Sequence, residues 1–131
     1  MNISVRFVEN AYIVDVAGNV NASNAHELKD TVSDAIEKKI AACILNMRKA
    51  TSLDSCGIGM LISVSAMLTR NGIVFRIVNI PRHILQILEC TRAIAILPTA
   101  HTILEAFSSL GMESRRARLL DTETFRAMIG V

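Results

Sequence analysis

The six residues from Asp54 to Gly59 combine a carboxylate, a hydroxyl and two glycines at the start of an apolar pattern with helical spacing. The first turn of a helix has unpaired backbone N–H groups and a partial positive charge. Asp54 or Ser55 can satisfy those groups as a helix cap, which is the simplest interpretation. The same position suits a phosphate, because a phosphorylated serine carries about −1.5 to −2 charge. The chemistry that this segment offers is therefore modification of the Ser55 hydroxyl.

The two glycines of this segment, Gly57 and Gly59, would leave little side chain around the Ser55 hydroxyl. The backbone of a partner or of a kinase could then approach closely. A glycine this early in a helix costs roughly 0.5–1 kcal/mol relative to alanine. We expect that either this close approach or tight packing beneath the helix compensates the cost.

The other residues with catalytic potential do not form a recognisable site. His26, His83 and His101 lie in three different predicted helices without the spacing of metal ligands. Gly57-Ile58-Gly59 matches half of a dinucleotide-binding fingerprint, but Ile62 stands where the third glycine belongs. A nucleophile elbow and a Gly-Lys-Ser/Thr loop are also missing from the sequence. We therefore expect no enzymatic activity, no metal and no cofactor.

Length and composition predict one domain with a packed core. The chain has 131 residues, of which 51% are hydrophobic, and 14 basic residues stand against 12 acidic ones. This balance gives no electrostatic reason to expect nucleic acid as a partner. No apolar run reaches the roughly 18 residues of a membrane helix, and the first residues lack the features of a signal peptide. We expect no membrane insertion and a cytoplasmic location.

The three cysteines, Cys43, Cys56 and Cys90, are odd in number and lack paired spacing, which argues against a disulfide framework. Cys43 and Cys90 lie in apolar surroundings, where we expect small buried side chains. Reduced thiols are typical of the cytosol.

Hydrophobic periodicity predicts an alternation of strands and helices. Residues 3–7 alternate apolar and polar, which predicts a strand with one covered face, paired as a hairpin with a strand over residues 11–17. Asn24, with Glu27 three residues later, predicts a capping box at the start of a helix. The apolar run over residues 42–46 predicts a central buried strand, followed by a polar loop over residues 47–53.

The second half of the chain continues this alternation. A helix begins near Asp54 or Ser55 and stops at Asn71-Gly72. The remaining predicted elements are a strand over residues 73–78, a helix from Pro81, a brief strand over residues 95–97 and a helix capped by Thr99 that runs to Leu110.

Strands that alternate with helices pair in parallel, and the opening hairpin adds an antiparallel pair. We predict an α/β fold with a mixed central β-sheet, an N-terminal antiparallel hairpin and about four helices packed on the sheet. This domain spans residues 1–110. Residues 111–131 form a charged C-terminal extension with a weak amphipathic pattern. The extension forms either a short helix against the domain or a partner, or a frayed tail.

The pattern Asp-Ser-x-Gly-x-Gly at residues 54–59, following a short apolar strand and opening a helix, resembles the phosphorylation motif of bacterial anti-sigma factor antagonists in the STAS domain family. The upstream segment over residues 18–22, Gly-Asn-Val-Asn-Ala, resembles the Gly-Glu-Leu-Asp loop of that family at the expected distance. The resemblance covers the element order from Ile3 to Leu110 and leaves out the C-terminal extension.

This resemblance implies a STAS-like protein-binding module. Ser55 would be the phosphorylated residue. Its partner would be an anti-sigma factor that is also a serine kinase, bound while Ser55 is unphosphorylated, so that a sigma factor is released. A phosphatase would restore the unphosphorylated state. The residues implied in partner contact are Asn21, Asp54, Cys56, Gly57, Ile58 and Gly59.

The sequence departs from the family pattern at three positions. Asn19 and Asn21 replace usual acidic residues, which bears on the choice of kinase, and Cys56 stands where serine or threonine is common. One alternative is a STAS-like scaffold or accessory subunit of a stress-sensing or lipid-transport complex, without phosphoryl switching. A small enzyme or nucleotide binder that uses residues 55–59 is another. A homodimer through an apolar strand edge or the C-terminal extension is also open.

Overall fold

The computed structural model describes residues 1–8 and 10–109, so the predicted end of the last helix at Leu110 and the extension over residues 111–131 lie outside the described residues. In the described part, four strands form one sheet in the order β1-β2-β3-β4. The strands are β1 (Asn2–Val8), β2 (Ala11–Val20), β3 (Ala42–Leu53) and β4 (Val74–Val78). The helices are α1 (Ala25–Glu37), α2 (Ser55–Arg70), α3 (Arg82–Cys90), the short 3-10 helix η1 (Ala93–Ala95) and α4 (Ile103–Ser109).

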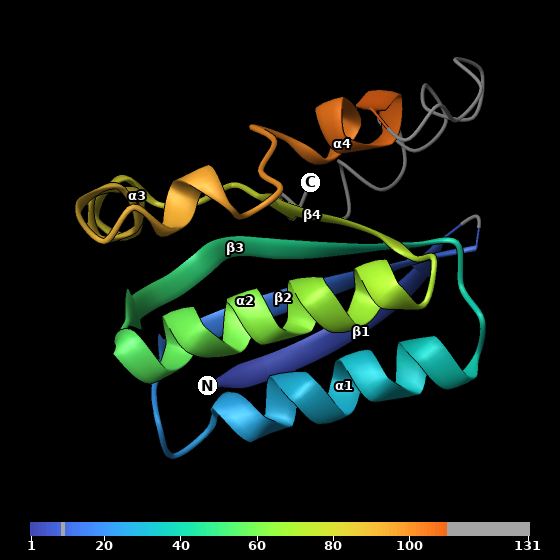
Figure 1. Ribbon diagram of the computed structural model, residues 1–131, viewed down its shortest axis with the longest axis horizontal. Helices are drawn as coiled ribbons and strands as arrows, with labels where there is room; N and C mark the ends of the chain where they lie inside the picture. Colours follow the sequence, from blue (N-terminus) through green and yellow to red (C-terminus); the bar gives the residue numbers. More distant parts are fainter. Residues whose placement is uncertain (9, 110–131) are drawn as a thin grey trace.

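The sheet is mixed, as predicted. β1 is antiparallel to β2, with Asn2 opposite Ala17 and Val8 opposite Ala11. β2, β3 and β4 are parallel to one another. Helices α1 and α2 lie side by side on one face of the sheet, and α4 packs on the other (Figure 1).

Two apolar clusters fill the space between these layers. On the face of α1 and α2, β2 contributes Tyr12, Val14 and Val16 to the larger cluster. On the opposite face, Ile13 and Ile44 pack against Phe107 of α4. Successive residues of β2 thus point to opposite faces of the sheet. On the second face, α4 covers only the half that lies near the start of β2. The alternation explains why the middle of the sheet is buried on both sides.

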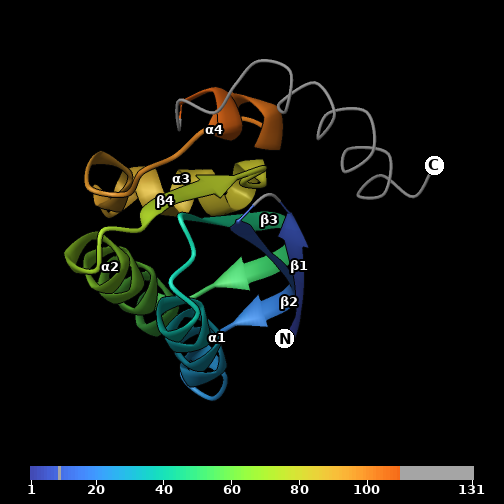
Figure 2. The same ribbon diagram turned by 90° about the vertical axis from the view of Figure 1, so that its right-hand side faces the viewer.

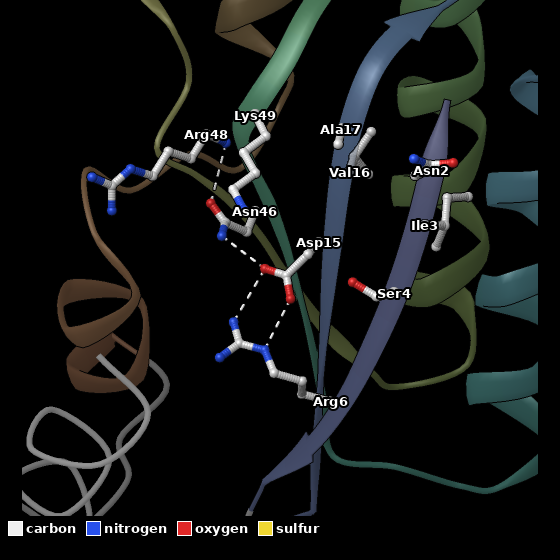
Figure 3. Close-up of a pocket in the computed structure, with 10 residues that line it drawn as sticks. All are labelled: Asn2, Ile3, Ser4, Arg6, Asp15, Val16, Ala17, Asn46, Arg48 and Lys49. Carbon is white, nitrogen blue, oxygen red and sulfur yellow. Dashed lines mark hydrogen bonds and ion pairs between the residues drawn. The ribbon is translucent and has the colours of Figure 1, made fainter. Parts of the chain in front are cut away.

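The half of this outer face that α4 leaves open is polar (Figure 3). Asp15 accepts two hydrogen bonds from the Arg6 guanidinium, at 2.9 and 3.1 Å, and a third from Asn46 Nδ2 at 2.8 Å. The Asn46 carbonyl oxygen accepts in turn from Asn79 Nδ2 at 3.1 Å. Asn46 is only 7% exposed, and these partners satisfy its buried amide. The network therefore ties β1, β2, β3 and the end of β4 together.

The prediction of a polar loop over residues 47–53 is wrong, because β3 continues to Leu53. The strand contains one extra residue between the pairs Asp15–Asn46 and Ala17–Lys49, and another between Gly18–Ala50 and Asn19–Ser52. Each bulge breaks the two-residue alternation that marks a strand in sequence. As a result, buried side chains recur every third residue, at Met47, Ala50 and Leu53.

The predicted strand over residues 95–97 is also wrong. Residues 93–95 form η1 instead, and the Ile96 N–H donates to the Ala93 carbonyl at 3.1 Å. Pairing with β4 is limited to an isolated bridge between Ile77 and Thr99. An apolar run of three residues is too short for periodicity to distinguish a strand from a helical turn.

Two predicted helix caps differ from the observed ones. The Asn24 side chain makes no capping bond to α1, because its oxygen accepts from the Asn21 N–H at 2.9 Å. The final helix begins later than predicted, and Thr102, not Thr99, accepts from the Glu105 N–H at 3.1 Å. The Asn24 side chain is therefore used by the preceding turn, and the Thr99 position pairs with β4 through its bridge to Ile77.

Two expectations about burial are wrong. Val5 and Phe7 on β1 are exposed, although their alternation predicted a covered face, because α1 does not extend over the edge strand. Cys90 is exposed at the end of α3, whereas Cys43 is buried in β3 as predicted. No helix in the described part of the chain is long and apolar enough to cross a membrane.

The cysteines provide a test of this packing. Burial raises the pKa of the Cys43 thiol to about 12, so it stays protonated at neutral pH, whereas Cys56 and Cys90 are exposed. Because thiolates are the reactive form, we expect iodoacetamide to label Cys56 and Cys90 in the folded protein and Cys43 only after denaturation. Peptide mass spectrometry measures the labelling. Equal labelling of Cys43 in the folded protein would contradict the packing of β3.

Candidate functional site

The candidate site lies where the ends of β2 and β3 meet the first turn of α2. Asp54 has an extended backbone, with φ −96° and ψ −178°, and caps α2 through a 2.9 Å hydrogen bond from the Gly57 N–H to Oδ1. The Asp54 N–H donates to the Val20 carbonyl at 3.2 Å. Asp54 therefore both starts the helix and attaches it to the end of β2, so of the two caps that the sequence allows, Asp54 is the one used.

Ser55 is the first residue of α2 and is exposed. The N–H groups of Gly57 and Ile58 are taken up by Asp54, through Oδ1 and through the backbone oxygen at 3.0 Å. Within the described residues no acceptor takes up the N–H groups of Ser55 and Cys56. The start of this sixteen-residue helix therefore presents an accessible hydroxyl next to two free donors and the positive end of the helix dipole.

The two glycines of the motif have different surroundings. A Cβ on Gly57 would lie 2.5 Å from Leu53 Cδ1 and 3.0 Å from the Val20 backbone oxygen. A Cβ on Gly59 would meet nothing within 4 Å. Tight packing beneath the helix therefore accounts for Gly57, which is one of the two explanations that the sequence left open. Gly59 lies on the exposed side, where no contact within the chain requires a glycine.

Two of the residues expected to contact the partner are buried in the folded chain. Asp54, Cys56 and Gly59 are exposed, but Gly57 is buried and Ile58 is only 9% exposed. Ile58 belongs to the larger apolar cluster and packs against the core from the first turn of α2. Gly57 and Ile58 thus shape the turn from beneath.

The loop between β2 and α1 is held by its own asparagines. The Asn21 side-chain oxygen accepts from the Ser23 N–H at 3.0 Å, and the Asn24 amide donates to the Asn19 carbonyl at 2.8 Å. These short-range bonds fix the loop without help from the rest of the chain. Asn21 is half-buried, and its carbonyl accepts from the Ala25 N–H at 2.9 Å at the start of α1.

A polar rim that the sequence analysis did not identify lies beside this loop. The Asn19 side-chain oxygen accepts hydrogen bonds from the hydroxyls of Thr51 and Ser52, at 2.6 and 2.8 Å. His83, on α3, donates from Nε2 to the Thr51 carbonyl at 2.7 Å. The rim thus joins β2, β3 and α3. Its signal in the sequence was the three-residue spacing of Met47, Ala50 and Leu53, which is typical of a bulged strand.

The rim and the start of α2 offer hydroxyls, amides and one imidazole. Among the described residues, no three His, Cys, Asp or Glu side chains cluster so that they could hold a metal ion. The three histidines are exposed, and His83 contacts the rim through the Thr51 carbonyl. The arrangement suits a surface that another protein contacts.

Comparison with known proteins identifies relatives of this arrangement. The family model described as the STAS domain matches residues 2–106. A candidate anti-sigma factor antagonist of Thermotoga maritima superposes with a TM-score of 0.76 at 22% identity, over 84% of this chain and 95% of that chain. An anti-sigma factor antagonist of Mycobacterium paratuberculosis gives 0.75 at 16% identity, over 85% and 94%. The phosphorylated form of the Bacillus cell fate determinant SpoIIAA gives 0.63 at 15% identity, over 83% and 99%.

The contrast between the two glycines generates a stability test. Gly57→Ala should lower the free energy of unfolding by about 1–3 kcal/mol, because the new methyl group overlaps Leu53 and the Val20 backbone. Gly59→Ala should raise it by roughly 0.5–1 kcal/mol, because alanine favours the helix and meets no neighbour. Urea unfolding followed by circular dichroism measures both. Equal effects of the two substitutions would contradict the close contact at Gly57.

Proposed function

Because the chain belongs to the STAS domain family, we propose that it is an anti-sigma factor antagonist whose binding is switched by phosphorylation of Ser55. In this proposal it binds an anti-sigma factor that is also a serine kinase, and binding releases a sigma factor. A phosphatase that acts on phosphorylated Ser55 resets the switch. The chain itself carries out no reaction and works in the cytoplasm.

The observation that carries this proposal is the position of Ser55. Ser55 is the first residue of α2 and is exposed. Asp54 caps the helix, so the Ser55 side chain is not needed to start it. A kinase can therefore reach the hydroxyl without unfolding the chain. The free N–H groups of Ser55 and Cys56 can hold phosphate oxygens after transfer.

The mechanism is exclusion of a charge from the interface. The unmodified site carries the single negative charge of Asp54, and phosphorylation adds about −1.5 to −2. A partner surface that fits a neutral hydroxyl would then bury an unpaired anion beside a carboxylate. Truncated or unpaired charges in interfaces cost about 2–5 kcal/mol. This cost is sufficient to release the partner from the chain without any rearrangement of the sheet.

The surface that we propose for the partner follows from the exposed residues of the site and the half-buried Asn21 beside them. It comprises Asn21, Asp54, Ser55, Cys56 and Gly59, with Gly57 and Ile58 supporting the turn from the interior. Asn21 accepts a backbone hydrogen bond as an aspartate would, so its loop keeps the same acceptor while losing one negative charge. Asn19 likewise serves as a neutral acceptor for two hydroxyls. The matching partner therefore needs fewer basic side chains than one that binds an acidic loop.

The switch is tested with the full chain as bait in extracts of its source cell. We expect unmodified and Ser55→Ala protein to retain an anti-sigma factor with a kinase domain, and Ser55→Asp to bind it at least ~30-fold more weakly, as an energy of about 2 kcal/mol implies. Calorimetry with the purified partner measures the affinity. Ser33→Asp places the same charge at a half-buried position on α1, outside the candidate site, and should bind like the unmodified chain.

Phosphorylation itself is measured by incubating the chain with that partner and ATP and mapping phosphate by mass spectrometry. Phosphate should appear on Ser55 and be absent from the Ser55→Ala variant. Ser52→Ala, which removes the nearest exposed serine of the rim, should leave the modification unchanged. Phosphate on Ser52 instead, or equal binding by Ser55→Asp and unmodified protein, would overturn the proposal.

A further inference from the structure

The edge strand β1 has an apolar side that nothing in the described part of the chain covers. Phe7 is 61% exposed and Val5 is 43% exposed. Both lie on the face of the sheet that carries α1 and α2, opposite Tyr12 and Val14 of β2. β1 has β2 as its neighbour on one side, and its other edge is the end of the sheet. The hydrogen-bonding groups of that edge therefore face solvent.

Helix α1 packs over β2 and does not cover β1, because contacts with Tyr12 hold its C-terminal part above β2. The Tyr12 hydroxyl donates to Asp34 of α1 at 2.9 Å, and Lys38 Nζ lies 5.6 Å from the centre of the Tyr12 ring. The Phe7 and Tyr12 rings meet in a T-shaped arrangement, with centroids 5.6 Å apart and planes at 85°. In Figure 2, β1 lies at the side of the sheet away from α2.

Edge strands are usually protected by lysine, proline or a bulge that prevents pairing with another chain. β1 has none of these, because it pairs with β2 in an uninterrupted register from Asn2 to Val8 and contains no proline or lysine. Its one charged side chain, Arg6, points to the opposite face and is neutralised by Asp15 (Figure 3). Neither shape nor charge therefore keeps a second strand away.

We propose that β1 pairs with β1 of a second copy of this chain, antiparallel and centred on Val5. In this register Val5 meets its own counterpart, and Ile3 meets Phe7 of the partner subunit. On the other face, Ser4 meets Arg6 of the partner subunit. A twofold dimer requires a patch that complements itself, and this strand does so with apolar against apolar and hydroxyl against guanidinium.

Neighbouring registers fit less well. Centring on Arg6 places two guanidinium groups directly opposite each other, and like charges in that position are destabilising. Centring on Ser4 leaves Phe7 opposite Met1, beyond the strand. Shifting by an odd number of residues brings the apolar face of one copy beside the polar face of the other. The register centred on Val5 alone covers Ile3, Val5 and Phe7 together.

The pairing would make an eight-stranded sheet from two four-stranded ones. The twofold axis reverses the strands of the second copy, so the two Ser55 sites lie at opposite ends and both stay exposed. The dimer is therefore independent of the proposed switch. A contact of seven residues per strand is small beside a standard interface, so we expect dissociation in the micromolar range.

Sedimentation equilibrium of the full chain tests the dimer. We expect a monomer–dimer equilibrium, and Phe7→Ser should raise the dissociation constant about 10-fold, because the dimer loses both of its Ile3–Phe7 cross-strand pairs. Ile96→Ser removes an apolar side chain that is 63% exposed but lies away from β1, and it should leave the constant unchanged. Circular dichroism confirms that both variants fold. A chain that stays monomeric up to millimolar concentration would overturn the proposal.

Disulfide formation tests the register. In a background with Cys56→Ser and Cys90→Ser, Val5→Cys should cross-link to itself, because Cβ atoms of opposed residues lie about 4.5–5.5 Å apart. Ile3→Cys and Phe7→Cys should each stay uncross-linked alone and form a mixed disulfide when combined. Non-reducing electrophoresis separates the products. A dimer in which Val5→Cys does not cross-link, or in which Ile3→Cys alone does, would contradict this pairing.

Discussion

The close approach of α2 to the end of β2 is the contact on which the candidate site depends. The Val20 carbonyl receives the Asp54 N–H and leaves no room for a side chain at residue 57. This contact fixes the direction in which the helix leaves the sheet, and Asp54 then caps the helix that it has positioned. Ser55 is exposed as a result, because the residue that follows the cap on a helix anchored from beneath faces outward. The accessibility of one hydroxyl thus originates in backbone packing several residues away.

The order of elements could be predicted wherever the apolar pattern was long and regular. The hairpin, the mixed sheet and the long helices follow from periodicity and from the stop at Asn71-Gly72. Periodicity gave wrong predictions where contacts between distant segments, and not the local sequence, decided which residues are buried. The pattern after Asn46 predicts a loop, because each bulge in β3 shifts the buried positions by one residue. The edge strand was expected to be covered, because alternation reports which side is apolar and does not reveal whether a helix reaches Phe7.

The candidate site was predictable in part. Capping chemistry placed the helix start at Asp54 or Ser55, since capping is a local property, and the structure assigns the cap to Asp54. The separate roles of Gly57 and Gly59 were not accessible, because only the packing of Val20 and Leu53 distinguishes them. The burial of Ile58 and the hydrogen bonds from Thr51 and Ser52 to Asn19 also depend on which segments meet in space. Sequence therefore located the helix start and its serine, and the fold decided which of the neighbouring residues are on the surface.

The bulged half of β3 has a consequence for how such a protein can diverge. Its two extra residues turn Arg48 and Lys49, and then Thr51 and Ser52, outward as adjacent pairs, while Met47, Ala50 and Leu53 hold the core. A regular strand would expose only every second residue. Arg48 and Lys49 can therefore vary in size and charge with little effect on stability, whereas changes at Thr51 and Ser52 also remove their hydroxyl bonds to Asn19. A duplicated gene could acquire a new recognition specificity by mutation of this strand alone, with the helix start and its serine left intact.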